Sequence, residues 1–469
     1  MIRIKTILTQ TGIHPFQKLL PWVGGLLVIF GFSHTLKSQS LYFPPSTGNQ
    51  WETTDPKSLG WCQPNIDSLY QYLEDKNSKA FILLKDGKIV LEKYFGTFNQ
   101  DSSWYWASAG KTLTAFCIGI AQQQGSLKLS DPSNKYLGNS WSSLTQSQED
   151  SITLWHHLTM TTGLDDEVSN LDCTDPSCLK FKAKPGTRWS YHNAPYTLLD
   201  KVIENSTSKS LNLFITQNIT AKSGIKGLFI DLDYNNVFFS TPRNMAKFGL
   251  LLLGKGTWNT TKILSDSQYF KQQINTSQSI NKSYGYLTWL NGKTSHMLPT
   301  LQYQFPGSIC TNAPADMYAA LGKNGQIINV VPSQNLVLIR MGNAPDNNPA
   351  SAISVALNDD IWKYINRFSC NAGTHTQPQY RINVWPNPAN SKEDIHLDFS
   401  FDVTTIAGGN EVIISITDPA GKKISTHSLI INEANTSYQL PQLAPGVYTL
   451  QCSLNQQVFL QNRLCVLPK

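Results

Sequence analysis

The stretch that decides the fold is KAFILLKDGKIVLEKYFG, residues 79–96. Apolar and β-branched residues fill both halves, and Asp86-Gly87 between them is a dipeptide suited to a tight turn. This pattern predicts two antiparallel strands. Much later in the chain, QIINVVP (326–332) and LVLIRMG (336–342) predict a second hairpin of the same kind.

The residues between these hairpins predict mostly helices. Gly125 is placed to end one helix, and Ser130-Asp131-Pro132 is a turn. AISVALNDDIWKYINRF (352–368) predicts a helix that packs on the sheet. Because strands lie at both ends of this region, the sheet must join its beginning to its end. We therefore expect an α+β domain over 41–370, with an antiparallel sheet flanked by helices and a helical subdomain.

Composition excludes several classes of protein. The chain has 469 residues, of which 40% are hydrophobic and 15% charged, so global disorder is excluded. The net charge is +6, but Arg3, Lys5, Lys18 and Lys37 precede residue 40, where no acidic residue occurs. Without these four cations the charge is +2. A nearly neutral body lacks the basic face that nucleic-acid binding requires, so no nucleic-acid partner is expected.

The first forty residues predict an export signal. Lys5 and Lys18 precede an apolar run, LLPWVGGLLVIFGF (19–32), and small residues follow at Ser38 and Ser40. The run is shorter than the roughly 20 apolar residues that span a bilayer. We expect a signal peptide over 1–40 and no stable transmembrane segment. An uncleaved membrane anchor is the alternative.

Eight cysteines fit an oxidising compartment. Cys173 and Cys178 enclose CTDPSC, a turn that could bring their sulfurs together, and Cys452 and Cys465 flank a predicted hairpin that they could bridge. Cys117 lies in an apolar helical run and is expected to be a buried thiol. The pairing of the others stays open: Cys62, Cys310 and Cys370.

Metal and cofactor sites are not expected. No Cys-x-x-Cys motif and no His/Cys cluster with zinc spacing occurs. His156 and His157 are adjacent, so their side chains diverge on a helix or a strand.

Composition changes near residue 371. NAGTHTQPQ is polar and turn-prone, which predicts a linker over 371–380. Beyond it, IHLDFSF, EVIISIT and GVYTLQCSL read as short strands separated by turns. We expect a small β-sandwich over 381–469.

The tail resembles a known secretion module. VWPNPA (384–389), DPAGKKIS, PGVYTL and the terminal RLCVLPK are similar, in this order, to the C-terminal sorting domain of the type IX secretion system. The resemblance implies export through both membranes, the type IX machinery as a partner, and a secreted or cell-surface location. A carbohydrate-binding or adhesive sandwich is the alternative.

The sequence Ser108-Ala-Gly-Lys111 opens a predicted helix that runs to about Gln124. Residues three apart share one helix face. A serine hydroxyl becomes a good nucleophile once a base removes its proton, and N–H groups at a helix start can stabilise an oxyanion. Alone the spacing is weak, because a plain N-cap serine is common and the same pattern occurs at Ser177/Lys180, Ser206/Lys209, Ser223/Lys226 and Ser279/Lys282.

A second motif, Tyr191-His192-Asn193, follows a Pro-Gly loop and precedes an amphipathic helix. A phenol is a usable base only if a nearby ammonium, here that of Lys111, favours its ionised form. The Asn193 amide can donate to substrate and accept from the lysine. His192 occupies the variable middle position and is expected to be structural.

Together the two motifs resemble the penicillin-recognising serine hydrolase superfamily, nearest to class C β-lactamases and related esterases. Four further segments are similar in the expected order: 154–167, 240–256, 283–290 and 319–340. The resemblance implies that Ser108 is the nucleophile, that Tyr191 and Lys111 move its proton, and that the N–H groups of Ser108 and Ala320 bind the oxyanion. It also places three residues beside the substrate: Asn193, Ala320 and Gly322. Asp165, Asp166 and Glu167 are expected to cap a helix rather than act as paired acids.

The chain departs from this family at the third motif, Lys-Thr-Gly. Counting back from Gly325 places that motif at Met317-Tyr318-Ala319, which offers no cation to hold a substrate carboxylate. We therefore expect a secreted serine esterase or amidase acting on a small-molecule or peptide substrate. Lys323 could restore a positive group, so a β-lactamase or D-Ala-D-Ala peptidase is the alternative. A catalytically silent binding protein and an adhesive role of the tail are further alternatives.

Overall fold

The structure is a computed structural model that describes residues 41–345, 353–370, 381–390, 394–400, 410–418, 421–431, 435–454 and 457–467. The predicted signal peptide (1–40) and linker (371–380) lie outside the described residues.

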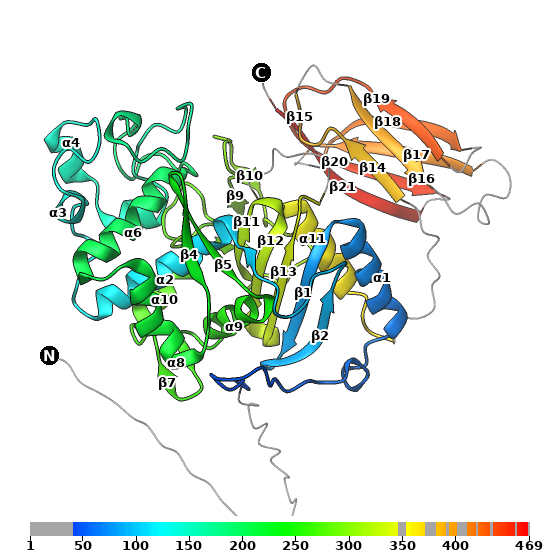
Figure 1. Cartoon of the computed structure of the whole chain (residues 1–469). Coiled ribbons are helices and arrows are strands. Elements are labelled where there is room, and N and C mark those ends of the chain that lie inside the picture. Colours follow the sequence, from blue (N-terminus) through cyan, green and yellow to red (C-terminus); the bar gives the residue numbers. More distant parts are fainter. Residues whose placement is uncertain are drawn as a thin grey trace, which may run out of the picture. The chain divides into compact units, whose positions relative to one another are not determined.

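An antiparallel sheet of six strands forms the centre of the large domain (Figure 1). Its first and last predicted hairpins meet directly, since β1 pairs with β13. In spatial order the strands are β2 (Lys88–Tyr94), β1 (Ser78–Lys85), β13 (Leu336–Gly342), β12 (Gln326–Val331), β11 (Tyr318–Gly322) and β8 (Trp289–Leu290). The predicted α+β fold, with a sheet that joins the beginning of the domain to its end, is confirmed.

The turn between β1 and β2 has the expected geometry. Asp86 and Gly87 both have positive φ, +53° and +85°, as a two-residue hairpin turn matched to the strand twist requires. A Cβ on Gly87 would lie 1.9 Å from the carbonyl oxygen of Tyr42. The backbone at Tyr42 can therefore lie against this turn only because residue 87 is a glycine.

Helices cover both faces of this sheet. On one face, α9 (Pro242–Leu253) packs so closely that a Cβ on Gly249 would lie 2.4 Å from Val337 Cγ1. On the other face, Asn358 of α11 (Val355–Ile365) exchanges side-chain hydrogen bonds with Asn329 of β12. Beside α11 lies α1 (Gln63–Asp75). The helix predicted over 352–368 is thus confirmed within narrower bounds.

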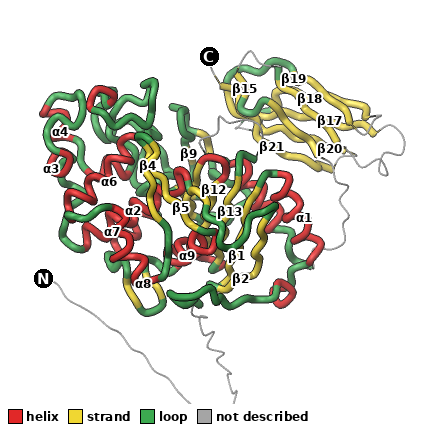
Figure 2. The backbone as a smooth tube through the Cα atoms, viewed as in Figure 1, coloured by secondary structure: helices red, strands yellow, loops and turns green. Residues whose placement is uncertain are grey.

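The helical part of the domain is built around α2 (Gly110–Gln123), which is buried along most of its length, and α6 (Asn193–Thr207), which packs on it (Figure 2). The remaining helices here are α3 (Asn134–Leu137), α4 (Gln146–Ser151), α5 (Leu154–Leu158), α7 (Leu211–Ile215), α8 (Ala221–Ser223) and α10 (Ser267–Gln273). Short strands complete it: β3 (Trp104–Tyr105), β4 (Leu228–Leu232), β5 (Asn235–Ser240), β6 (Thr257–Trp258), β7 (Thr261–Lys262), β9 (Ser295–His296) and β10 (Phe305–Pro306).

Arg340 of β13 is fully buried and joins three parts of the domain. Its guanidinium donates to Ser78 Oγ, to the carbonyl of Lys76 after α1, and to the carbonyls of Asn324 and Gly325 in the β11–β12 turn. Burial lowers the pKa of this guanidinium to about 9. The turn that follows β11 is therefore anchored from inside the domain.

Replacing this side chain should destabilise the domain. For Arg340→Met we expect a loss of about 3 kcal/mol in the free energy of unfolding, because the buried carbonyls lose their donors. Urea unfolding followed by tryptophan fluorescence measures this change. Arg367→Met, at an exposed site, is the control and should change the free energy by less than about 0.5 kcal/mol. Equal stability of the two variants would contradict the anchoring role.

The C-terminal region forms two sheets. One contains β14 (Arg381–Trp385), β16 (Ile395–Ser400) and β19 (Asn435–Leu440). The other contains β15 (Ala389–Asn390), β21 (Gln457–Leu467), β20 (Gly446–Leu454), β17 (Asn410–Thr417) and β18 (Lys423–Ile431). Val412, Ile414 and Ile416 alternate along β17 and are fully buried. The strand-rich tail that the sequence predicted is confirmed.

Disulfides join Cys62 to Cys370 and Cys173 to Cys178. The suggested Cys452–Cys465 bridge is wrong, because the register of β20 and β21 pairs Cys452 with Leu460 and Cys465 with Val447. Cys117 is a buried free thiol, as expected, and so is Cys310. Within the described ranges, no helix is long and apolar enough to cross a membrane, and no group of three or more His, Cys, Asp or Glu side chains could hold a metal ion.

Candidate active site

Ser108 lies in a short 3-10 turn, Ala107–Ala109, that leads directly into α2. Its side chain is half-buried, and Lys111 Nζ donates a hydrogen bond to Ser108 Oγ over 2.9 Å. Ala107 has a φ of +47°, a left-handed conformation that costs a residue with a Cβ free energy. The backbone just before Ser108 is therefore held in a strained conformation that fixes where the hydroxyl lies.

Lys111 is almost fully buried, with 3% of its surface exposed. Its Nζ lies 4.3 Å from the ring centroid of Tyr196 and 5.1 Å from that of Tyr191. Burial lowers the pKa of Lys111 to about 7, while the carboxylates of Asp172 and Asp200 oppose this change. A substantial fraction of the amine is therefore neutral near pH 7 and can accept a proton.

Tyr191 lies beside this pair, as the second motif predicted. Burial raises the pKa of its phenol well above the usual range, and a hydrogen-bonding influence of Ser108 partly opposes this rise. The phenolic oxygen nevertheless makes no hydrogen bond of ordinary length to any described residue. The sequence predicts that the Lys111 ammonium favours the ionised form of this phenol, whereas burial is the larger influence and raises the phenol pKa.

An aromatic cluster holds Tyr191 in place. Trp289 of β8 stacks on its ring with 5.7 Å between centroids, and Tyr284 and Trp189 pack against its edges at 6.3 and 6.2 Å. Trp289 also pairs with Ala319 of β11. The aromatic stretch 283–290, which the family resemblance placed near the site, therefore forms the wall behind Tyr191.

Asn193 is the first residue of α6, and its amide contacts Asp172 instead of the expected Lys111. Its Nδ2 donates to Asp172 Oδ1 over 2.7 Å, and its Oδ1 is buried without a hydrogen-bond partner in the described structure. The expected hydrogen bond from Lys111 to Asn193 is therefore absent. Further along α6, the carboxyl of Asp200 is buried, accepts from Asn236 Nδ2 over 3.0 Å, and has a pKa raised to about 8 by burial.

The end of β11 closes the site on the other side of Ser108. A Cβ on Gly322 would lie 2.4 Å from the carbonyl oxygen of Trp106 and 3.1 Å from the backbone nitrogen of Ser108. The strand therefore passes directly against the turn that holds Ser108, and only glycine fits there. Ala320 lies two residues earlier on the same strand and is buried.

The predicted position of the third motif, Met317–Ala319, is not where β11 comes closest to Ser108. The turn between β11 and β12 holds only three residues, Lys323–Gly325. Counting back from Gly325 on the assumption of a longer turn therefore gives a position too early in the strand. Tyr318 donates its hydroxyl to the carbonyl of Leu252 in α9, and the close approach to Ser108 occurs at Gly322. The residues at the end of this strand, Ala320-Leu321-Gly322, also lack a cation.

The other polar residues considered from the sequence have different roles. Asp166 forms an ion pair with Arg188 at 2.6 Å, and Asp165 and Glu167 both contact Lys182, so they do not form an acid pair. His157 is buried between Ser133 and the carbonyl of Pro195, and His156 contacts Thr153. His192 is buried beside Tyr191, and burial lowers its pKa to about 4, so its ring is neutral.

Residues 71–358 match the family model described as Beta-lactamase. The chain belongs to the beta-lactamase family. A related protein from Alkalihalophilus pseudofirmus, described as uncharacterized, is 25% identical over 311 residues, which cover 58% of this chain and 85% of that protein. Members of the beta-lactamase fold family are hydrolases that include esterases and amidases.

Two solved structures share the fold of this beta-lactamase family member. One is described as "Putative 6-aminohexanoate-dimer hydrolase from Bacillus anthracis"; it is 19% identical, with a TM-score of 0.52 over 70% of this chain and 91% of that one. The other is a family VIII carboxylesterase, 13% identical, with a TM-score of 0.50 over 68% of this chain and 99% of that one. At these identities the likeness concerns the fold alone.

Residues 383–466 match the family model described as Secretion system C-terminal sorting domain. The tail thus addresses this beta-lactamase family member to type IX secretion and so to the cell surface or the exterior.

Proposed function

We propose that the protein is a secreted serine hydrolase that cleaves an ester or amide bond through an acyl-enzyme on Ser108. The observation that carries this proposal is the 2.9 Å hydrogen bond between Ser108 Oγ and the buried amine of Lys111. A hydroxyl next to an amine of lowered pKa is an activated nucleophile.

The proposed reaction begins with neutral Lys111 taking the proton of Ser108 as Oγ attacks the carbonyl carbon. The resulting oxyanion lies between the N–H of Ser108 and a backbone N–H at the end of β11, where Gly322 lies against the turn of Ser108. Ala320, the donor expected from the sequence, lies two residues before this contact on the same strand. When the tetrahedral intermediate collapses, the leaving group departs with the proton that Lys111 had taken from Ser108. The neutral phenol of Tyr191 can donate a hydrogen bond to this leaving group. Water then attacks the acyl-enzyme, with Lys111 as base again, and the acid product is released.

The residues at the end of β11 favour a substrate with an uncharged acyl group. Neither Ala320 nor Leu321 can hold a carboxylate, and the wall around Tyr191 is aromatic. The solved structures that share the fold include one described as a family VIII carboxylesterase and one described as a putative 6-aminohexanoate-dimer hydrolase, and both descriptions are compatible with this proposal. A β-lactamase or D-Ala-D-Ala peptidase remains the second candidate, because exposed Lys323 directly follows Gly322.

Covalent labelling tests this proposal. The mature protein is incubated with p-nitrophenyl butyrate, a cephalosporin and a D-Ala-D-Ala peptide, quenched in acid, and analysed by intact mass and peptide mapping. We expect turnover of the ester and a butyryl adduct on the peptide that contains Ser108. An adduct with the cephalosporin alone would favour the second candidate. A complete lack of adducts and turnover would contradict a hydrolase and favour a silent binding protein.

The pH dependence of this activity follows from Lys111. Its amine accepts a proton only when neutral, so kcat/KM should rise about tenfold per pH unit below the pKa of about 7 and level off above it. Initial rates with p-nitrophenyl butyrate from pH 5 to 9, corrected for hydrolysis without protein, give this profile. A rate that does not change across this range, or that keeps rising to pH 9, would contradict Lys111 as the base.

A further inference from the structure

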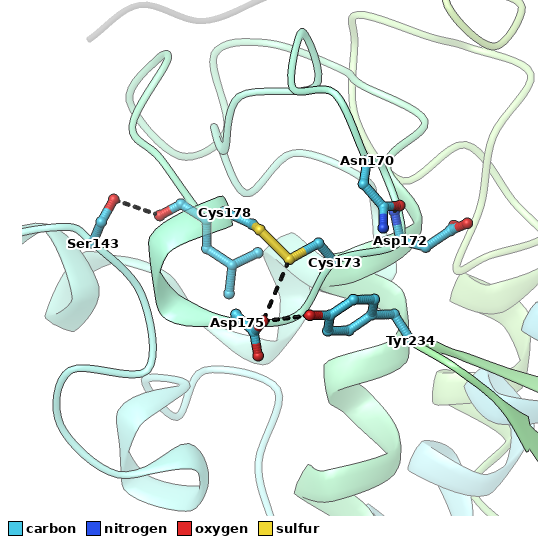
Figure 3. The surroundings of a disulfide bond; sticks show 8 residues. Ser143, Asn170, Asp172, Cys173, Asp175, Cys178 and Tyr234 are labelled. Carbon is cyan, nitrogen blue, oxygen red and sulfur yellow. Dashed lines mark hydrogen bonds between the residues drawn. A yellow bond between two sulfur atoms is a disulfide. The ribbon is translucent and has the colours of Figure 1, made fainter.

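The loop of residues 170–178 contains the disulfide between Cys173 and Cys178 (Figure 3). The disulfide closes the second part of this loop, and in the first part Asn170 Oδ1 accepts from the backbone N–H of Asp172 over 3.0 Å. At its far side, Asp175 accepts from the hydroxyl of Tyr234, which extends from the turn between β4 and β5. The loop is therefore fixed by a covalent bond and by contacts at both ends.

This loop contacts the second motif directly. The N–H of Ala194 donates to the carbonyl of Leu171 over 3.0 Å, and Asn193 Nδ2 donates to Asp172 Oδ1 over 2.7 Å. Asp172 is half-buried and forms no ion pair with a described lysine or arginine. Its carboxylate therefore acts on Asn193 rather than being neutralised by a cation.

We propose that Asp172 is a positioning residue of the active site, which orients the Asn193 amide and places a negative charge toward the buried Lys111 side chain. This inference rests on the proposed hydrolase function. A carboxylate only accepts hydrogen bonds, so it selects the NH2 side of an amide that could otherwise point either way. The carbonyl oxygen of Asn193 is then left buried and free to accept an N–H from a substrate.

The surroundings of the Lys111 amine define the second effect of Asp172. Ser108 Oγ and the rings of Tyr191 and Tyr196 lie beside the amine, and the carboxyls of Asp172 and Asp200 act on its pKa electrostatically. Of the two carboxyls, Asp200 is the buried one, with its pKa raised to about 8. Asp200 is therefore mostly uncharged near pH 7, and loss of the charge at Asp172 should lower the pKa of Lys111 further.

Asp172→Asn tests both effects, with Asp175→Asn as the matched control. The control changes the same charge in the same loop, yet Asp175 contacts Tyr234 and not Asn193. For Asp172→Asn we expect a roughly tenfold fall in plateau kcat/KM and a midpoint of the pH profile shifted to lower pH. We also expect a loss of preference for p-nitrophenyl N-acetylglycinate over p-nitrophenyl acetoxyacetate, in which oxygen replaces the N–H. Asp175→Asn should match the wild-type protein in all three measurements.

The possible failures are distinguishable. If the wild-type protein forms no adduct at Ser108, the proposed function itself fails. If it does, and Asp172→Asn keeps the wild-type plateau, midpoint and preference, the positioning role is overturned. Equal loss in both variants, with the pH midpoint unchanged, would show that the loop is merely structural and would also overturn it. The double variant Cys173→Ser/Cys178→Ser removes the disulfide that holds Asp172 in place. It should therefore lose the preference for p-nitrophenyl N-acetylglycinate, as Asp172→Asn does. Retention of this preference would count against the proposal.

Discussion

Ser108→Ala is expected to lower kcat/KM for p-nitrophenyl butyrate by at least about 10⁴-fold and to abolish the acyl adduct. The hydroxyl is the only part of the proposed machinery that forms a bond to the substrate, and loss of a catalytic serine costs several orders of magnitude in known serine hydrolases. The methyl group that remains fills the same half-buried site, so the fold and the Lys111 pocket should persist. Stopped assays combined with intact mass measure both effects.

Ser279→Ala is the matched control for this variant. Ser279 stands in one of the other Ser-x-x-Lys tetrads, with Lys282, and is exposed. It should keep wild-type activity. If Ser108→Ala retained more than a tenth of the wild-type rate with an unchanged melting temperature, another residue would have to carry the acyl group.

Lys111→Met should lower kcat/KM by about 10³–10⁴-fold, since general base catalysis contributes up to this much. Methionine replaces the buried aliphatic chain at similar volume, so the loss would reflect the amine rather than a cavity. The measurement is again the steady-state rate with p-nitrophenyl butyrate, accompanied by thermal unfolding.

Lys111→Arg separates the two roles that this residue could have. A guanidinium keeps the positive charge but does not take up a proton near neutral pH. If Lys111 is the base, Lys111→Arg should be as impaired as Lys111→Met, whereas Lys282→Met in the exposed tetrad should be unaffected. Substantial activity in Lys111→Arg would show that the positive charge is what catalysis needs from residue 111. Tyr191 would then be the base, as the sequence first suggested.

Short-range patterns predicted much of this molecule correctly. The Asp86-Gly87 turn and its flanking strands follow from local propensity, and so does the pairing of Cys173 with Cys178 across a five-residue separation. The contact between Ser108 and Lys111 was predictable because it depends on their spacing of three residues along the chain. The motif that contains Tyr191 was recognised through the family resemblance. These features depend on residues close in sequence or on a motif of fixed length.

The features that were missed depend on distant contacts. The position of Gly322 next to Ser108 depends on the length of the β11–β12 turn, and the separation of Cys452 from Cys465 depends on strand register. The raised pKa of Tyr191 reflects burial by aromatic rings from another part of the chain. Asp200 carried one local signal, since an acidic residue on the buried side of an otherwise amphipathic helix is uncommon.

The place of β1 in the sheet has a consequence for when the domain can fold. β1 lies between β2 and β13, and β11 passes beside Ser108, so both the centre of the sheet and the surroundings of Ser108 need strands from the end of the domain. A chain that crosses a membrane amino-terminus first cannot complete this sheet until residue 342 has emerged. The sheet is thus completed late in the passage of the chain, and the bond between Cys62 and Cys370 joins the two ends of the same domain covalently.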